Sequence, residues 1–232
     1  ESCGMLVSAA EMAISDDHEG IIEVQDDAEI GTPFAEIFGL DDPIIEIDLT
    51  PNRVDCAGVR GIARDLAAAG LGKLRPLENA QIKSDHPSSV SVKIEDQDGC
   101  KLFLGRTIKG VKNGPSPEWL QQLLKAVGLR PISTLVDITN YLSLDLCRPL
   151  HVYDIQKLSG DIVVRAAKNG EEFEALNDKS YKAQGGEIAI ADNSGLIGFG
   201  GIVGGVSTSC DEETTDVFLE CAYFSPLRIA KT

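Results

Sequence analysis

The spacing of hydrophobic positions changes along the chain, and each change marks a different kind of predicted element. At residues 59–67, Val, Ile, Ala and Leu recur three and four positions apart ahead of Gly70, which predicts a helix ended by that glycine. Upstream of this helix the apolar runs are short and broken. They predict a strand leading into a helical turn at 4–12, a turn and strand at 15–24, a short helix at 31–40, and a strand at 43–49.

A second pattern begins near residue 89. Amphipathic spacing predicts a helix at 116–129 that Gly128 ends, with a buried stripe made of Trp119, Leu120, Leu123, Leu124 and Val127. Ser133 is predicted to cap a second helix, over 133–146. Alternating or β-branched runs predict strands at 89–96, 100–111, 161–167, 187–192 and 216–224, with a hairpin at 171–183 and a glycine-rich strand and turn at 196–206.

These elements predict an α+β (mixed α/β) fold with two parts. The stretch "LGKLRPLENAQIKSDHPSS" is polar, contains proline and has little periodicity, which is typical of a linker. We therefore predict one domain over 1–78, a linker over 79–88 and a second domain over 89–232.

Composition narrows the possible functions. The 232 residues include 43% hydrophobic residues and carry a formal net charge of −16, which argues against broad binding to a phosphate backbone. Six cysteines occur without a C-x-x-C pair, as expected of reduced thiols in a cytoplasmic protein. The sequence holds neither a secretory signal nor an apolar run of about 20 residues, so no membrane association is expected.

His151, one of three histidines, is the first candidate for chemistry. An imidazole can act as a base, a donor or a ligand near neutral pH. A lone histidine is more often structural, so both interpretations stay open. Zinc-site spacing is missing around it, and we expect no metal. Asp154 could orient the ring.

Glu220 lies in the apolar strand sequence "VFLECAYF", where a carboxylate is costly unless it has a partner. Strand alternation puts Glu220, Phe218 and Ala222 on one face, which favours a half-buried position. The carboxylate faces either solvent or a pocket.

A glycine cluster could bring backbone close to a ligand, although a tight hairpin explains it equally well; its members are Gly198, Gly200, Gly201, Gly204 and Gly205. The order matches neither a Walker loop nor a dinucleotide fingerprint. Thr139 and Asn140 are short polar residues in an apolar helix, where they could line a site or form a cap. Arg130 could neutralise a phosphate or carboxylate, or could be a solvated surface charge.

Several motifs together resemble a known family. "WLQQLLKAVGLRPISTLVDITNYLSLDLCRPLHVYD", "GGIVGG" and "DVFLECAYFSPLRI" resemble the editing module of bacterial phenylalanine–tRNA ligase beta subunits, and "DLTPNRVDCAGVRGIARDLAA" resembles the segment before that module. The similarity covers essentially the whole chain. It implies that 1–78 is the C-terminal part of a discontinuous domain following an OB-type insert, and that the module continues beyond Thr232. One departure is "HVYD", where many members carry Ala and Phe; we expect it not to alter the chemistry.

The resemblance implies a function as well as a fold. Members join phenylalanine to tRNA(Phe) using ATP and Mg²⁺ at sites outside this chain, as heterotetramers with an alpha subunit, and this fragment is expected to need no cofactor. The module hydrolyses Tyr-tRNA(Phe) when the tRNA 3′ end presents a tyrosine moiety. Carried over to this chain, the catalytic residues are His151 and Glu220, and the substrate-binding residues are Thr139, Asn140, Arg130, Gly200, Gly201, Gly204, Gly205 and Ala222. Two alternatives remain: a non-catalytic scaffold of the beta subunit, and a free-standing sugar- or aldehyde-binding domain.

Overall fold

The computed structural model describes residues 4–24, 28–78 and 80–232. The chain forms two compact units, Glu1–Glu46 and Ile47–Thr232. Cys3 and Asn79, the first residue of the predicted linker, lie outside the described residues. The predicted boundaries at 78 and 88 stay a prediction.

The first unit consists mostly of turns around one short helix. Helix α1 spans Phe34–Ile37, within the predicted helix, and the rings of Phe34 and Phe38 pack with centroids 4.6 Å apart. Residues 9–14 form turns, closed for example by the Ala13 amide donating to the Ala10 carbonyl at 3.0 Å. The described residues of this unit contain no strand, so the strands predicted at 4–12 and 15–24 are wrong there.

The strand predicted at 43–49 is also wrong, since these residues form irregular, extended chain. Its large apolar side chains are exposed: Ile44 by 68% and Ile45 by 76%. A strand needs a neighbour to accept its backbone hydrogen bonds, and no described strand pairs with this segment.

The second unit begins with a 3₁₀ turn, η1 (Val54–Cys56), and helix α2 (Val59–Ala68). Arg53 joins them, because its guanidinium contacts Asp55 at 3.0 Å and Asp65 at 2.5 Å. Gly70 has a φ of +80°, which confirms it as the residue that ends the helix.

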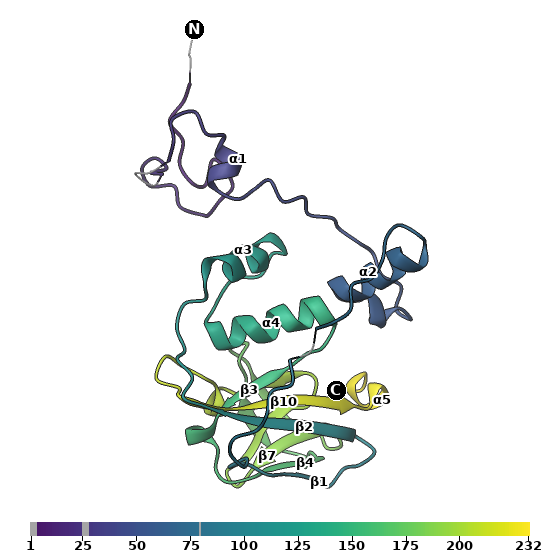
Figure 1. Cartoon of the computed structure of the whole chain (residues 1–232). Helices are drawn as coiled ribbons and strands as arrows, with labels where there is room; N and C mark the ends of the chain where they lie inside the picture. The colour runs from purple at the N-terminus through teal and green to yellow at the C-terminus, as the bar shows by residue number, and fades with distance from the viewer. Residues whose placement is uncertain (1–3, 25–27, 79) are drawn as a thin grey trace. The chain divides into compact units, whose positions relative to one another are not determined.

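Two sheets form the body of this unit (Figure 1). The five-stranded sheet has the order β1-β4-β7-β8-β9, with β1 and β4 parallel and the other neighbours antiparallel; its strands are β1 Val92–Ile94, β4 Ile162–Ala166, β7 Ile188–Asp192, β8 Gly195–Phe199 and β9 Val203–Gly204. The antiparallel three-stranded sheet has the order β2-β10-β3; its strands are β2 Cys100–Lys109, β10 Asp216–Phe224 and β3 His151–Asp154.

The smaller elements complete this unit: the hairpin β5 Glu172–Glu174 with β6 Ser180–Lys182, the 3₁₀ turns η2 Ile155–Lys157 and η3 Val206–Thr208, and helix α5 Pro226–Ile229. Together with the sheets and helices they confirm the predicted mixed α+β class. None of the helices in the described part of the chain has the length and apolar character needed to cross a bilayer.

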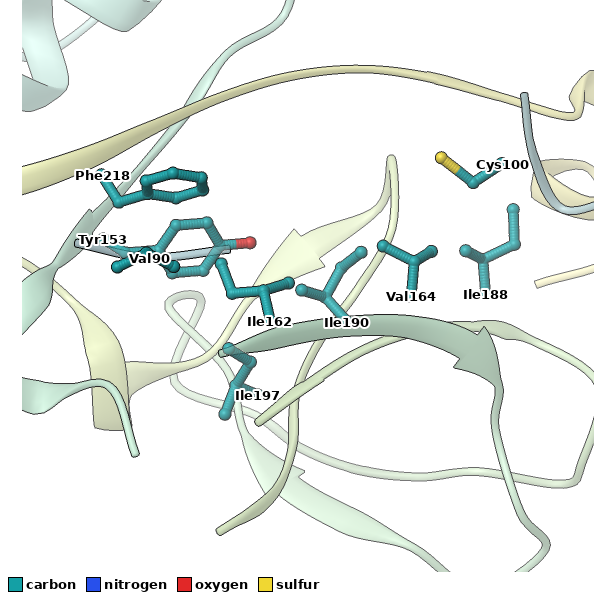
Figure 2. Packing of buried hydrophobic residues seen from close by; sticks show 9 residues of the cluster. All are labelled: Val90, Cys100, Tyr153, Ile162, Val164, Ile188, Ile190, Ile197 and Phe218. Carbon is teal, nitrogen blue, oxygen red and sulfur yellow. The ribbon is translucent and has the colours of Figure 1, made fainter. Parts of the chain in front are cut away.

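The main core lies between the two sheets (Figure 2). The five-stranded sheet supplies isoleucine and valine side chains, the three-stranded sheet supplies two aromatic rings and a cysteine, and one valine precedes β1. The buried members are Val90, Cys100, Tyr153, Ile162, Val164, Ile188, Ile190, Ile197 and Phe218. Every residue of β7 is buried, because this strand is central in its sheet and covered on both faces.

Helix α4 (Thr134–Leu146) contacts strand β3 of the three-stranded sheet. Helix α3 (Glu118–Ala126) in turn contacts α4. The predicted buried stripe of α3 is only partly correct. Leu120 and Leu124 are buried, but Trp119, Leu123 and Val127 are 55%, 43% and 52% exposed. Trp119 does reach α4, where its ring packs edge-on against Tyr141. Three of the five residues of the predicted stripe therefore stay largely exposed.

The start of α4 differs from the prediction in one detail. Ser133 occupies the N-cap position, but its side chain makes no capping hydrogen bond. The fully buried Asp137 carboxylate instead accepts the Ile132 amide at 2.9 Å and the Ser116 hydroxyl at 2.5 Å. Asp137 thereby connects the helix start to the segment preceding α3.

Candidate functional site

A cavity of about 290 Å³ opens between the edge of β3 and the glycine-rich turn that joins β8 to β9. Its walls come from strands β3, β7, β8, β9 and β10 and from that turn. Its lining residues are Pro149, Leu150, His151, Tyr153, Ile190, Gly198, Phe199, Gly200, Gly201, Ile202, Val203, Gly204, Glu220, Ala222 and Phe224. Neither lysine nor arginine occurs among them, so the polar groups of this cavity meet no cationic side chain in its lining.

Strand pairing brings the two main candidates together. β3 and β10 are antiparallel, and their register sets His151 directly opposite Glu220 and Tyr153 opposite Phe218. Directly opposite side chains on one face of such a pair lie about 5 Å apart at Cβ. Alternation along β3 puts Tyr153 on the same face as His151. Tyr153 and Glu220, which are 67 positions apart in the sequence, thus meet in the same cavity as His151.

His151 is held as an uncharged imidazole. Burial lowers the pKa of His151 to about 4, so the ring is neutral at physiological pH. Its edge packs on the Tyr153 ring, with centroids 4.4 Å apart and planes at 74°. Nε2 is enclosed and has no hydrogen-bond partner among the described residues. An enclosed, unpaired polar atom is uncommon in folded proteins and is often found where a ligand binds.

Glu220 is only 6% exposed, more buried than the half-buried position predicted for it. The Tyr153 hydroxyl donates a hydrogen bond to its Oε2 at 2.5 Å. Burial raises the pKa of Glu220 to about 7, and the hydrogen bond from Tyr153 acts in the opposite direction. Burial and the nearby Glu220 carboxylate raise the pKa of Tyr153 well above its usual value, so it remains the donor. A carboxyl group that titrates near neutrality inside a cavity is typical of functional sites.

The glycine-rich turn is shaped by close contacts. A Cβ on Gly204 would lie 2.3 Å from Cε1 of His151, and one on Gly200 would lie 2.8 Å from the Phe224 ring. Gly201 has a φ of +74°. The amides of Gly200 and Gly205 already donate to backbone carbonyls, each at 2.8 Å, so they are not free to bind a ligand.

The cavity gathers six of the ten residues predicted for the site: His151, Glu220, Gly200, Gly201, Gly204 and Ala222. The other four do not line it. Thr139 donates its hydroxyl to the Val136 carbonyl within α4, and Asn140 is its neighbour in that helix. Arg130 is exposed between α3 and α4. A Cβ on Gly205 would meet the Ile197 carbonyl oxygen at 2.5 Å, so this glycine serves close packing against β8.

Tyr153 is the residue that the sequence reasoning missed. Its position two residues after His151 was the available signal, because alternate residues of a strand share a face. The apolar sequence around it gave no reason to expect that its hydroxyl would find a buried carboxylate.

The part of the chain that forms this cavity matches a known class of domain. The B3/4 domain family matches residues 99–232, which include both sheets' cavity-lining strands, and the chain belongs to that family. More particularly, the chain is similar over its whole length to phenylalanine–tRNA ligase beta subunits. The chain is 54% identical over 235 residues to the "Phenylalanine--tRNA ligase beta subunit" of Cereibacter sphaeroides and 52% identical over 232 residues to that of Novosphingobium aromaticivorans.

These alignments cover 100% of this chain and 29% of each relative, so the chain spans less than a third of their length. A crystal structure of an N-terminal fragment of the phenylalanyl-tRNA synthetase beta subunit from Pyrococcus horikoshii aligns with 76% of this chain and 54% of its own, at 17% identity and a TM-score of 0.46.

Proposed function

We propose that the cavity between β3 and β10 is an editing site that hydrolyses tyrosine esterified to tRNA(Phe). The observation that carries the proposal is the pairing of an uncharged His151 with a buried Glu220 across one small cavity. A volume of about 290 Å³ suits an amino-acid side chain with its ester group rather than a whole nucleotide.

The selectivity would come from the carboxylate. Tyrosine and phenylalanine differ by one hydroxyl, which a synthetic site rejects imperfectly, so a second site that requires the hydroxyl corrects the error. Glu220 would accept the phenol O–H of tyrosine. Bound phenylalanine would leave that acceptor unpaired, at a cost of about 1–3 kcal/mol, or roughly a 5- to 150-fold preference for tyrosine.

The hydrolysis is a water addition to the ester carbonyl. The acyl carbon gains the water oxygen, the bond to the ribose oxygen breaks, and a proton passes to that oxygen. An imidazole whose pKa is about 4 is a weak base, so His151 would orient the water through a ring nitrogen rather than take its proton fully. Gly201 and Gly204 would line the ester side of the cavity, while Gly200 and Gly205 keep the turn in shape.

The remaining predicted residues and partners belong to the larger assembly. Thr139, Asn140 and Arg130 would act outside the cavity, toward the rest of the tRNA 3′ end. The net charge of −16 fits a chain that receives only that end, while other parts of the ligase hold the tRNA. ATP, Mg²⁺ and the alpha subunit would serve the synthetic reaction of a cytoplasmic ligase, outside this chain.

Deacylation by the assembled ligase tests the proposal. Purified Tyr-tRNA(Phe) and Phe-tRNA(Phe) are incubated with wild type, His151→Ala, Glu220→Gln and the control Glu213→Gln, which makes the same change at an exposed position. We expect His151→Ala to slow hydrolysis about 100-fold. Glu220→Gln should remove most of the preference for tyrosine, and the control should match wild type. If both cavity variants hydrolyse and discriminate like wild type, this domain is a scaffold and the proposal is wrong.

A further inference from the structure

The Tyr153 side chain lines the cavity and binds Glu220, and the proposed reaction gives it no role. It is 3% exposed, its ring lies beside Phe218 in the core (Figure 2), and its hydroxyl reaches Oε2 of Glu220 at 2.5 Å. Both residues line the cavity. A buried tyrosine hydroxyl needs a hydrogen-bond partner, but the partner here is the one carboxylate of the cavity.

The hydrogen bond uses one of two carboxylate oxygens. Oε2 of Glu220 accepts from Tyr153, while Oε1 receives no hydrogen bond from the described residues. The terminal torsion of a glutamate is broad, so a free carboxylate could turn either oxygen toward the cavity. The Tyr153 ring packs against the His151 ring, with the two ring centroids 4.4 Å apart, and against the hydrophobic core. A donor at a fixed place therefore determines which oxygen stays available.

We propose that Tyr153 is a specificity-determining, positioning residue, which occupies Oε2 of Glu220 and presents Oε1 to the phenol hydroxyl of the bound aminoacyl group. This inference rests on the editing function proposed above and adds a residue to it. It revises the expectation that the tyrosine of "HVYD" leaves the chemistry unaltered, since a phenylalanine in its place would fill similar space and donate nothing.

The same hydrogen bond helps to keep Glu220 charged. The groups that face this carboxyl are His151 and Tyr153 from β3 and Cys100 from β2. His151 is uncharged, and Cys100 is a thiol whose pKa burial raises, so neither group stabilises the charged carboxylate by attraction. Tyr153 is the group that lowers the pKa of Glu220 against the effect of burial. Without it, the pKa would lie above about 7, and the carboxyl would be mostly protonated at neutral pH.

The test is Tyr153→Phe in the assembled ligase, with Tyr223→Phe as the matched control. Tyr223 lies on β10, the strand that carries Glu220, but it is 54% exposed and does not line the cavity. The measured quantity is the ratio of kcat/KM for Tyr-tRNA(Phe) to kcat/KM for Phe-tRNA(Phe), followed from pH 6 to 9.

We expect the ratio at pH 7 to fall about tenfold in Tyr153→Phe, and the pH midpoint of the ratio to move up by about one unit. Raising the pH should recover part of the lost selectivity, and Tyr223→Phe should behave like wild type. A merely structural role for Tyr153 would instead lower both kcat/KM values in parallel at every pH, without moving the midpoint. That result would overturn the inference, as would a ratio equal to that of wild type.

A second measurement keeps the inference testable if Tyr153→Phe loses activity because it folds poorly. A ¹³C-carboxyl NMR titration of Glu220 should give a higher midpoint in Tyr153→Phe than in wild type, and a lower one when 3-fluorotyrosine, a stronger donor, stands at 153. Equal midpoints in all three would overturn the inference. Failure of the two proposals is distinguishable: if Glu220→Gln changes the ratio and Tyr153→Phe does not, only the role of Tyr153 is wrong. If the wild-type ligase hydrolyses neither ester, both are wrong.

Discussion

A methyl group on Gly204 should displace His151 from the cavity wall. The Cβ of Gly204→Ala would lie 2.3 Å from Cε1, 2.7 Å from Nε2 and 3.1 Å from Nδ1 of His151. Carbon atoms in contact are separated by about 3.5–4.0 Å, so the ring and the strand must move apart by more than ~1 Å.

Neither side of this contact moves easily. The imidazole is packed edge-on against Tyr153, whose hydroxyl is bound to Glu220. On the other side, the Gly204 carbonyl accepts the Leu176 amide at 3.0 Å, and Gly204 pairs with Gly198 of β8. Overpacking of this kind costs about 1–3 kcal/mol. A shift of ~1 Å in a group that orients the attacking water lowers the rate by about 100-fold.

The assay compares Gly204→Ala with Gly114→Ala, because a Cβ on Gly114 would have nothing within 4 Å. Unfolding by denaturant measures the stability of each variant, and deacylation of Tyr-tRNA(Phe) by the assembled ligase measures the rate. We expect Gly204→Ala to lose about 2 kcal/mol of stability and most of its activity, and Gly114→Ala to lose neither. Wild-type stability together with a wild-type rate in Gly204→Ala would show that the ring is not confined as described.

Two further predictions concern stability. The folded pKa of Glu220, about 7, lies above its usual 4.5, so its contribution to stability is present in full below pH 4.5 and is lost as the pH rises through 7. Relative to Glu220→Gln, wild type should therefore lose about 3 kcal/mol of unfolding free energy between pH 4.5 and 8, and a pH-independent difference in denaturant unfolding would contradict this. Asp137→Ala removes the acceptor for the Ser116 hydroxyl and the Ile132 amide, and should cost about 3 kcal/mol in the same assay; a loss below about 0.5 kcal/mol would indicate that water replaces the carboxylate.

The local sequence was sufficient to predict an element in two cases: where the element's own residues provide its hydrogen bonds, as in a helix, and where polar and apolar residues alternate clearly, as in a strand. Helix α2 was predicted from periodicity and ended at Gly70, and α4 was predicted to follow directly on Ser133. Strand β10 was predicted with the correct bounds, and its alternation already put Glu220 on the face of Phe218. The resemblance of the motifs to phenylalanine–tRNA ligase beta subunits was likewise contained in the sequence and is confirmed.

Tertiary structure decided everything that depends on which elements meet. The 43–49 segment has strand periodicity, but none of the described strands lies beside it to accept its hydrogen bonds, so it stays irregular. Trp119 and Leu123 lie on a correct helical stripe, yet α3 meets too little protein to bury them. Burial and hydrogen bonding between elements depend on both of the surfaces that meet. The sequence of one segment does not show which other segment it will contact. For the same reason the contact between Tyr153 and Glu220, which sets the charge and orientation of the cavity's carboxyl group, appears only when β3 and β10 are side by side.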